Sequence, residues 1–288
     1  MQRAGQIVFH AFLCRVPTER QRHLLGLLPE EELALLRTLP YSFLDPTQGI
    51  SQPSALLKKA HASWLAPFIR TLPENDIRLL LASLEEPQRA GLKKDLLFSN
   101  HFPTLNPLAM RYVQQLLTQN LIENQKEILP LECLPEHPLN ELLNLNKEEL
   151  SHMINLLGIH DVAFELRHII ETAKIKQVQN ALDPQEQNYL KKLLQQQELI
   201  TFKRMGLDKW DGNVANLKKL IHQRGLNRIG KSLFGLDDSL VWHLSRRLST
   251  ADAATLHKLC SDLKNTQAVT LLTRQIMEMI TLVKKDHP

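Results

Sequence analysis

Eight residues in the C-terminal third of the chain match a pattern that cradles nucleotide phosphates. The run Gly225-Leu226-Asn227-Arg228-Ile229-Gly230-Lys231-Ser232 has the form G-x-x-x-x-G-K-S, in which the lysine contacts phosphate oxygens and the hydroxyl binds magnesium. Such a cradle requires a buried strand directly before it, whereas residues 216–224 form a charged helical pattern. We therefore interpret Gly225 as the C-cap of a helix followed by a turn, and we expect no nucleotide hydrolysis.

Two further pairs have the spacing of metal ligands. Glu149 and His152, and likewise Glu165 and His168, are three residues apart, which places an acid and an imidazole on one helix face, as in di-iron bundles. Those bundles use long helices that bring additional carboxylates inward, whereas these pairs lie on short predicted helices, and Glu149 is already explained as a capping residue. We expect no metal, no cofactor and no catalytic centre.

The elements that would position these residues follow an internal repeat. Five segments begin with a leucine, have an acidic residue four positions later, an apolar residue at eight and a leucine near eleven. The repeat begins at Leu28, Leu72, Leu145, Leu182 and Leu248, with acids at Glu32, Asp76, Glu149, Glu186 and Asp252 and eighth residues at Leu36, Leu80, Met153, Leu190 and Leu256.

Each segment has the signals of a helix start. Asn146, Asp183 and Ser249 follow their leucines as N-caps, and the acid three residues later completes a capping box. Pro29 and Pro73 take that position in the other two copies, where a missing amide hydrogen costs little. The helices are too short to be stable alone, so they must bury their apolar stripes on one another. The repeat predicts a stack of short helices.

Composition supports an all-α fold. Leucine occurs 57 times and valine only 9 times, and no Val/Ile-rich run of the kind found in parallel sheets occurs. The three cysteines are far apart and follow no ligand spacing, which favours a reducing cytosol. No apolar run of 18 residues occurs, so we expect no membrane insertion and a cytoplasmic protein, with peripheral attachment at the inner membrane left open.

The positive charge is concentrated in one part of the chain. The net charge is +4, and residues 201–248 contain ten Lys or Arg against four Asp and no Glu. A solvated helical face is the simplest interpretation. An alternative is a basic helical nucleic-acid-binding protein, in which phosphates are contacted by Lys218, Lys219, Arg224, Arg228 and Lys231.

The prolines suggest two modules. Leu129 to Pro138 contains three prolines in ten residues and cannot be helical throughout. We place the domain boundary there, between an N-terminal helical module (1–128), which ends in a longer linker helix (108–128), and a C-terminal helical module (129–288). Within the second module, Gly158 is expected to end a helix.

Several motifs resemble the FliG family of flagellar motor switch proteins, which are built from short armadillo-like helices. One run leads from Leu236-Asp237-Asp238 through Arg246-Arg247 to the helix start at Ser249, and is similar to the family's C-terminal domain. Glu136-His137-Pro138 resembles the signature that opens the family's middle domain, and the segment from Gly158 to Leu166 repeats part of the C-terminal pattern.

The resemblance implies a bacterial, non-enzymatic scaffold. Such proteins connect a membrane-embedded ring to a cytoplasmic ring or sorting platform of a flagellar or type III secretion apparatus, through concave helical surfaces. Its protein partners would be components of that basal body, and self-association is left open. The partner-binding residues that it implies are Asp237, Asp238, Arg246, Arg247, Glu136, His137 and Pro138.

Overall fold

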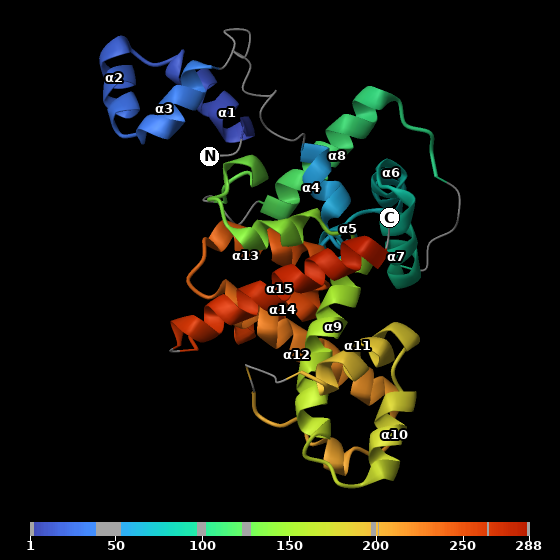
Figure 1. The fold of residues 1–288 in the computed structure, drawn as a ribbon. Helices are drawn as coiled ribbons and strands as arrows, with labels where there is room; N and C mark the ends of the chain where they lie inside the picture. The colour runs from blue at the N-terminus through green and yellow to red at the C-terminus, as the bar shows by residue number, and fades with distance from the viewer. Residues whose placement is uncertain are drawn as a thin grey trace. The chain divides into compact units, whose positions relative to one another are not determined.

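The computed structural model describes residues 3–38, 53–96, 102–122, 128–196, 200, 202–263 and 265–286. These residues form helices and connecting turns without a strand, which confirms the all-α prediction (Figure 1). The chain divides into two compact units. Unit 1 comprises Met1–His137 and Asp237–Thr250, and unit 2 comprises Pro138–Leu236 and Ala251–Pro288.

All five leucine-led segments begin a helix at the predicted place. The helices are α3 (Glu30–Arg37), α6 (Glu74–Ser83), α9 (Lys147–Leu166), α11 (Pro184–Leu194) and α14 (Thr250–Leu259). Asn146 and Asp183 cap α9 and α11 in complete capping boxes, and Pro29 and Pro73 precede α3 and α6. The residue at the eighth position is at most 7% exposed in every copy. The repeat therefore marks where helices start and which side they bury.

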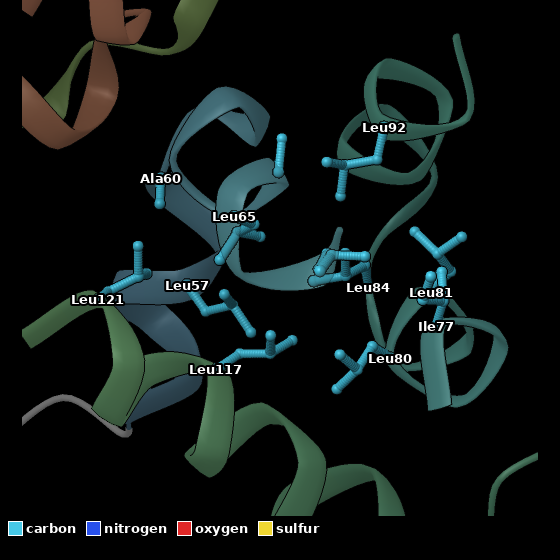
Figure 2. Close-up of a cluster of buried hydrophobic side chains, with 12 residues drawn as sticks. Leu57, Ala60, Leu65, Ile77, Leu80, Leu81, Leu84, Leu92, Leu117 and Leu121 are labelled. Atoms are coloured by element: carbon cyan, nitrogen blue, oxygen red, sulfur yellow. The ribbon is translucent and has the colours of Figure 1, made fainter. Parts of the chain in front are cut away.

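Unit 1 contains the N-terminal helices and one helix from much later in the chain. Its core gathers apolar side chains from α4 to α8, and Figure 2 shows these side chains converging between the helices. Leu117 and Leu121 extend from α8 toward Leu57 of α4, and α8 packs on both α4 and α6. The helices of unit 1, in addition to α3 and α6, are α1 (Arg3–Leu13), α2 (Thr18–Gly26), α4 (Pro53–Lys59), α5 (Ala66–Ile69), α7 (Glu86–Leu96), α8 (Pro107–Ile122) and α13 (Asp238–Arg247), with 3₁₀ turns η2 (Ala62–Trp64) and η3 (Leu131–Cys133).

The predicted linker helix belongs to this core. It was expected over 108–128, whereas α8 covers Pro107–Ile122 and residues 123–127 lie outside the described part of the chain. The sequence also places the domain boundary at 128/129. In the structure, unit 1 continues to His137 and takes in Asp237–Thr250.

Hydrogen bonds hold α13 in unit 1. The Trp64 indole Nε1 donates to the carbonyl of Leu248 at 3.0 Å and more weakly to that of Ser245, so η2 supplies donors to the C-terminal carbonyls of α13. The His61 amide donates to the carbonyl of Arg246 at 2.7 Å. At the other side of the helix, His243 Nε2 donates to the carbonyl of Leu129 at 2.8 Å. These contacts join residues more than a hundred positions apart. The local sequence therefore does not predict that α13 packs with the N-terminal helices of unit 1.

Unit 2 is organised around two twenty-residue helices, α9 and α12 (Val214–Leu233), which lie side by side (Figure 1). Helix α11 packs on α9, and α15 packs on both α9 and α12. A core of buried aliphatic side chains from α9 to α12 includes Ile159, Val162, Val178, Leu190 and Leu217. The remaining elements are α10 (Thr172–Asn180) and α15 (Thr266–Asp286), with 3₁₀ turns η4 (Pro138–Asn144) and η5 (Leu207–Lys209).

The crossing of α9 and α12 is made by a reciprocal pair of glycines. A Cβ on Gly158 would lie 2.0 Å from the carbonyl oxygen of Ile221, and a Cβ on Gly225 would lie 1.8 Å from that of Ile154. Each helix thus presents a glycine to the backbone of the other, at a spacing that no side chain permits. The predictions that Gly158 ends a helix and that Gly225 is a C-cap are therefore wrong, since both lie inside helices.

Candidate functional sites

The phosphate-cradle pattern lies entirely within a helix. All eight residues of Gly225–Ser232 belong to α12, so their amides serve the helix ladder and do not form a loop. Gly230 packs against the end of α14, where an added Cβ would lie 3.1 Å from the carbonyl carbon of Leu259. Ser232 Oγ donates to the carbonyl of Ile229, and Lys231 Nζ donates to Ser261. The two glycines of the pattern are therefore explained by the close packing of α12 against α9 and against the end of α14.

One of the proposed phosphate ligands is in the interior of unit 2. Arg228 is fully buried, and its Nη2 donates to Asp161 Oδ1 at 2.5 Å. Its Nη1 donates to Gln275 Oε1 at 2.8 Å, and its guanidinium lies 5.4 Å from the centre of the Phe202 ring. This side chain links α9, α12 and α15 and does not present its charge to a phosphate at the surface.

The other basic candidates on α12 have different surroundings. Lys218 is exposed and pairs with Asp183 at 2.9 Å, an interaction that raises its pKa through a hydrogen bond to that carboxylate. Arg224 donates to the carbonyl of Arg204 and lies 3.8 Å from Asp161 Oδ2. Lys219 is exposed. The structure therefore does not bring the five predicted residues together as one exposed row of cations.

The two acid–histidine pairs have structural roles. Glu149 closes the capping box of α9 with Asn146. Glu165 is buried and accepts hydrogen bonds from the backbone amides of Met205, Gly206 and Leu207, at 2.6 to 2.8 Å. It thereby fixes the turn into η5, where Gly206 has a φ of 83°. Within the described ranges, no group of three or more His, Cys, Asp or Glu side chains is arranged to hold a metal ion.

Four of the residues that the FliG resemblance implies lie on or next to α13. Asp237 is its N-cap and accepts a hydrogen bond from the Ser239 amide at 2.8 Å, and Asp238 is exposed in the first turn. Arg246 lies between two indole rings, with its guanidinium 3.8 Å from the Trp64 ring centre and 4.8 Å from that of Trp242. This residue packs in unit 1 as a cation–π contact.

The C-terminal end of α13 carries a concentration of positive charge. Burial lowers the pKa of Arg246, and burial together with the nearby charge of Arg247 lowers the pKa of Lys59, which Glu132 partly offsets. Arg247 is therefore close to Lys59 within unit 1. An acidic group brought near these residues would relieve their mutual repulsion.

The signature at 136–138 spans the division between the two units. Glu136 is exposed, and burial lowers the pKa of the partly exposed His137. Pro138 is exposed and begins η4 in unit 2. Glu136 and His137 therefore belong to the same unit as α13, whereas Pro138 belongs to unit 2.

An apolar stripe on α8 was missed by sequence reasoning. Leu108, Tyr112 and Leu116 are 78%, 62% and 40% exposed and follow one another at intervals of four residues, which aligns them on one side of the helix. The opposite side buries Leu117 and Leu121 in the core of unit 1. We call the three exposed residues the α8 stripe. The signal was present in the sequence, because α8 has apolar residues at too many positions for a single face.

Comparisons with known proteins add no relative. No family model matches the chain, and no curated protein and no solved structure matches it. In the part of the chain that the structure describes, no helix has the length and apolar character needed to cross a membrane.

Proposed function

We propose that the protein is a non-enzymatic adaptor that binds partner proteins through exposed helical surfaces. The observation that carries this proposal is the α8 stripe, which leaves three large apolar side chains in solvent on a helix whose opposite side buries Leu117 and Leu121 in the core of unit 1. Scattered apolar residues on a surface are ordinary, but a row with helical spacing is the arrangement that a partner helix covers.

The composition of α8 favours a protein partner for this stripe. Arg111 is the only charged residue among the sixteen of the helix, and the residues beside the stripe include Gln115 and Gln119. Aromatic and apolar residues with few charges are typical of the buried centre of an interface. We expect an amphipathic helix of the partner to lie along α8, with Tyr112 at the centre of the contact.

The class of partner comes from the resemblance to the FliG family. On that basis we propose that the chain links a membrane ring to a cytoplasmic ring or sorting platform in a flagellar or type III secretion apparatus. Support comes from the local structure of the matching run, because α13 begins after its Asp237 cap and α14 begins at Thr250, where the resemblance places helix starts. Asp238 and Arg247, at the two ends of α13, are proposed to contact a second partner.

An affinity pull-down from cells that contain the native machine tests this proposal. The double substitution Leu108→Ser and Tyr112→Ser is expected to remove a membrane-ring or cytoplasmic-ring component that wild type recovers, with unchanged helical content by circular dichroism. Leu79→Ser is the control, because Leu79 is an exposed leucine on α6 that lies outside the stripe. Equal recovery by all three proteins, or recovery of ribosomal or nucleoid proteins in place of ring components, would overturn the proposal.

A further inference from the structure

The first three helices of unit 1 enclose a pocket of about 400 Å³. This volume lies in the range of sites that hold small molecules, which are mostly apolar with a few placed polar groups. The pocket's apolar wall is formed by one or two leucines from each helix, namely Leu13 of α1, Leu25 of α2, and Leu33 and Leu36 of α3. Leu13 and Leu36 are buried, whereas Leu25 and Leu33 are partly exposed, as expected for side chains that face an open cavity.

The pocket lining also includes polar side chains. Arg37 is exposed and contributes the guanidinium, and His10 and Gln21 contribute an imidazole and an amide. Among the described residues that line the pocket, none is an aspartate or a glutamate. A ligand with an apolar body and an anionic end therefore meets leucine side chains along its body and a cation at its end, without a carboxylate to repel it.

We propose that this pocket binds a small amphiphile with an aliphatic chain and a carboxylate head. The chain lies against Leu13, Leu33 and Leu36, and the carboxylate is held by Arg37 at the mouth. A bulky nucleotide or a sugar would leave the leucine wall unpaired, and an uncharged hydrocarbon would leave the arginine without an anion. The site is independent of the α8 stripe and of the adaptor function.

Cys14 provides a direct reporter of occupancy. It lines the pocket and is exposed, with its Sγ 4.0 Å from His10 Nδ1. Cys133 and Cys260 are only partly exposed and do not line the pocket, so they serve as internal controls in the same molecule. A ligand in the pocket would shield the Cys14 thiol from a small alkylating reagent and leave the other two reaction rates unchanged.

The experiment measures iodoacetamide alkylation of the full chain by peptide mass spectrometry, with decanoate added below its micelle concentration. Cys14 should be protected in a saturable way, and octanoate should bind about 15-fold more weakly than decanoate, since each methylene contributes about fourfold. Decanol, which lacks the anionic head, should protect less. Protection of all three cysteines alike, or none at Cys14, would overturn the proposal.

Two matched variants test the assigned head group. Arg37→Gln should weaken protection by decanoate by about 3- to 10-fold and leave decanol unchanged, because only the ion pair is lost. Arg22→Gln, an exposed arginine of α2 that does not line the pocket, should behave as wild type. An equal loss of decanoate protection in both variants would show a general effect of charge and would contradict the assignment of Arg37 as the carboxylate ligand. Protection of Cys14 by anionic lipid vesicles but not by dissolved decanoate would assign this face to a bilayer and also overturn the proposal.

Discussion

Gly158 on α9 and Gly225 on α12 occupy one helix crossing, and each receives the backbone of the opposite helix where its own Cβ would be. The added Cβ atoms would lie 2.0 Å and 1.8 Å from carbonyl oxygens, which are fixed by the helix and have no flexible side chain to move. The close packing of α9 against α12 therefore requires a hydrogen atom in place of a side chain at both positions. A substitution must push the helices apart.

We predict that Gly158→Ala lowers the free energy of unfolding of unit 2 by about 2–4 kcal/mol, although alanine is the better helix former. Gly225→Ala should have a similar effect. Gly26→Ala is the control, because no atom lies within 4 Å of its added Cβ. Denaturant unfolding and hydrogen exchange of α9 and α12 peptides measure the effect. A midpoint for Gly158→Ala equal to that of the control would contradict the close crossing.

Arg228 and Asp161 form a buried ion pair that ties α12 to α9. We predict that Arg228→Ala costs about 3–5 kcal/mol of stability, because the buried Asp161 carboxylate loses its closest cation and keeps only Arg224, which lies 3.8 Å from its Oδ2. The double variant Arg228→Met with Asp161→Leu should recover most of this loss, since it removes both charges and keeps the volume. Calorimetry of the three proteins checks the ordering.

The control for this ion pair is the exposed one between Lys218 and Asp183. Lys218→Ala should change stability by at most about 1 kcal/mol, because solvent screens the pair and the variant no longer has to order a long lysine side chain. If Arg228→Ala and Lys218→Ala had equal effects, the burial of Arg228 would not hold in solution.

Local signals could be read from the sequence, and contacts between distant residues could not. Asn146 and Asp183 predict the starts of their helices, because an N-cap and the acid of its capping box are only three residues apart. Gly225 resembles a helix end in the sequence. The feature that requires glycine there is the Ile154 carbonyl of another helix, which the local sequence does not show. Arg228 reads as a surface cation for the same reason, since its partner is 67 residues away. The apolar residues on more than one face of α8 can be read from the sequence, but the sequence does not say which of them are exposed, because an exposed leucine and a buried one look alike.

His243 gives unit 1 a predicted sensitivity to acid. Burial lowers the pKa of this imidazole, an effect that Lys59 reinforces and that the Leu129 carbonyl and Glu132 partly oppose. Its folded-state pKa is therefore below the unfolded value of about 6.5, so the unfolded chain binds more protons in that interval. The stabilisation is complete above about pH 6.5 and declines as the pH falls below it.

His243→Gln should reduce this decline, because its amide nitrogen can still donate to the Leu129 carbonyl but does not titrate. Melting temperatures between about pH 7.5 and pH 5 should converge for the two proteins as the pH falls. His137, whose pKa burial also lowers, leaves a residual slope in the variant. His23→Gln, at an exposed position of α2, is the control and should keep the wild-type slope. An unchanged slope in His243→Gln would refute the assignment.

The basic stretch at 201–248 is predicted not to bind nucleic acid. Arg228 is buried, Lys218 is paired with Asp183, and Lys231 donates to Ser261, so the cations available to phosphates are fewer than the sequence suggests. Short DNA and RNA should show no mobility shift with the purified chain at about 50 mM salt, where phosphate contacts are strong. A shift that weakens steeply with added salt and that Lys219→Gln diminishes would contradict this prediction. It would favour the nucleic-acid-binding alternative, because loss of one phosphate contact reduces the salt dependence by about one counterion.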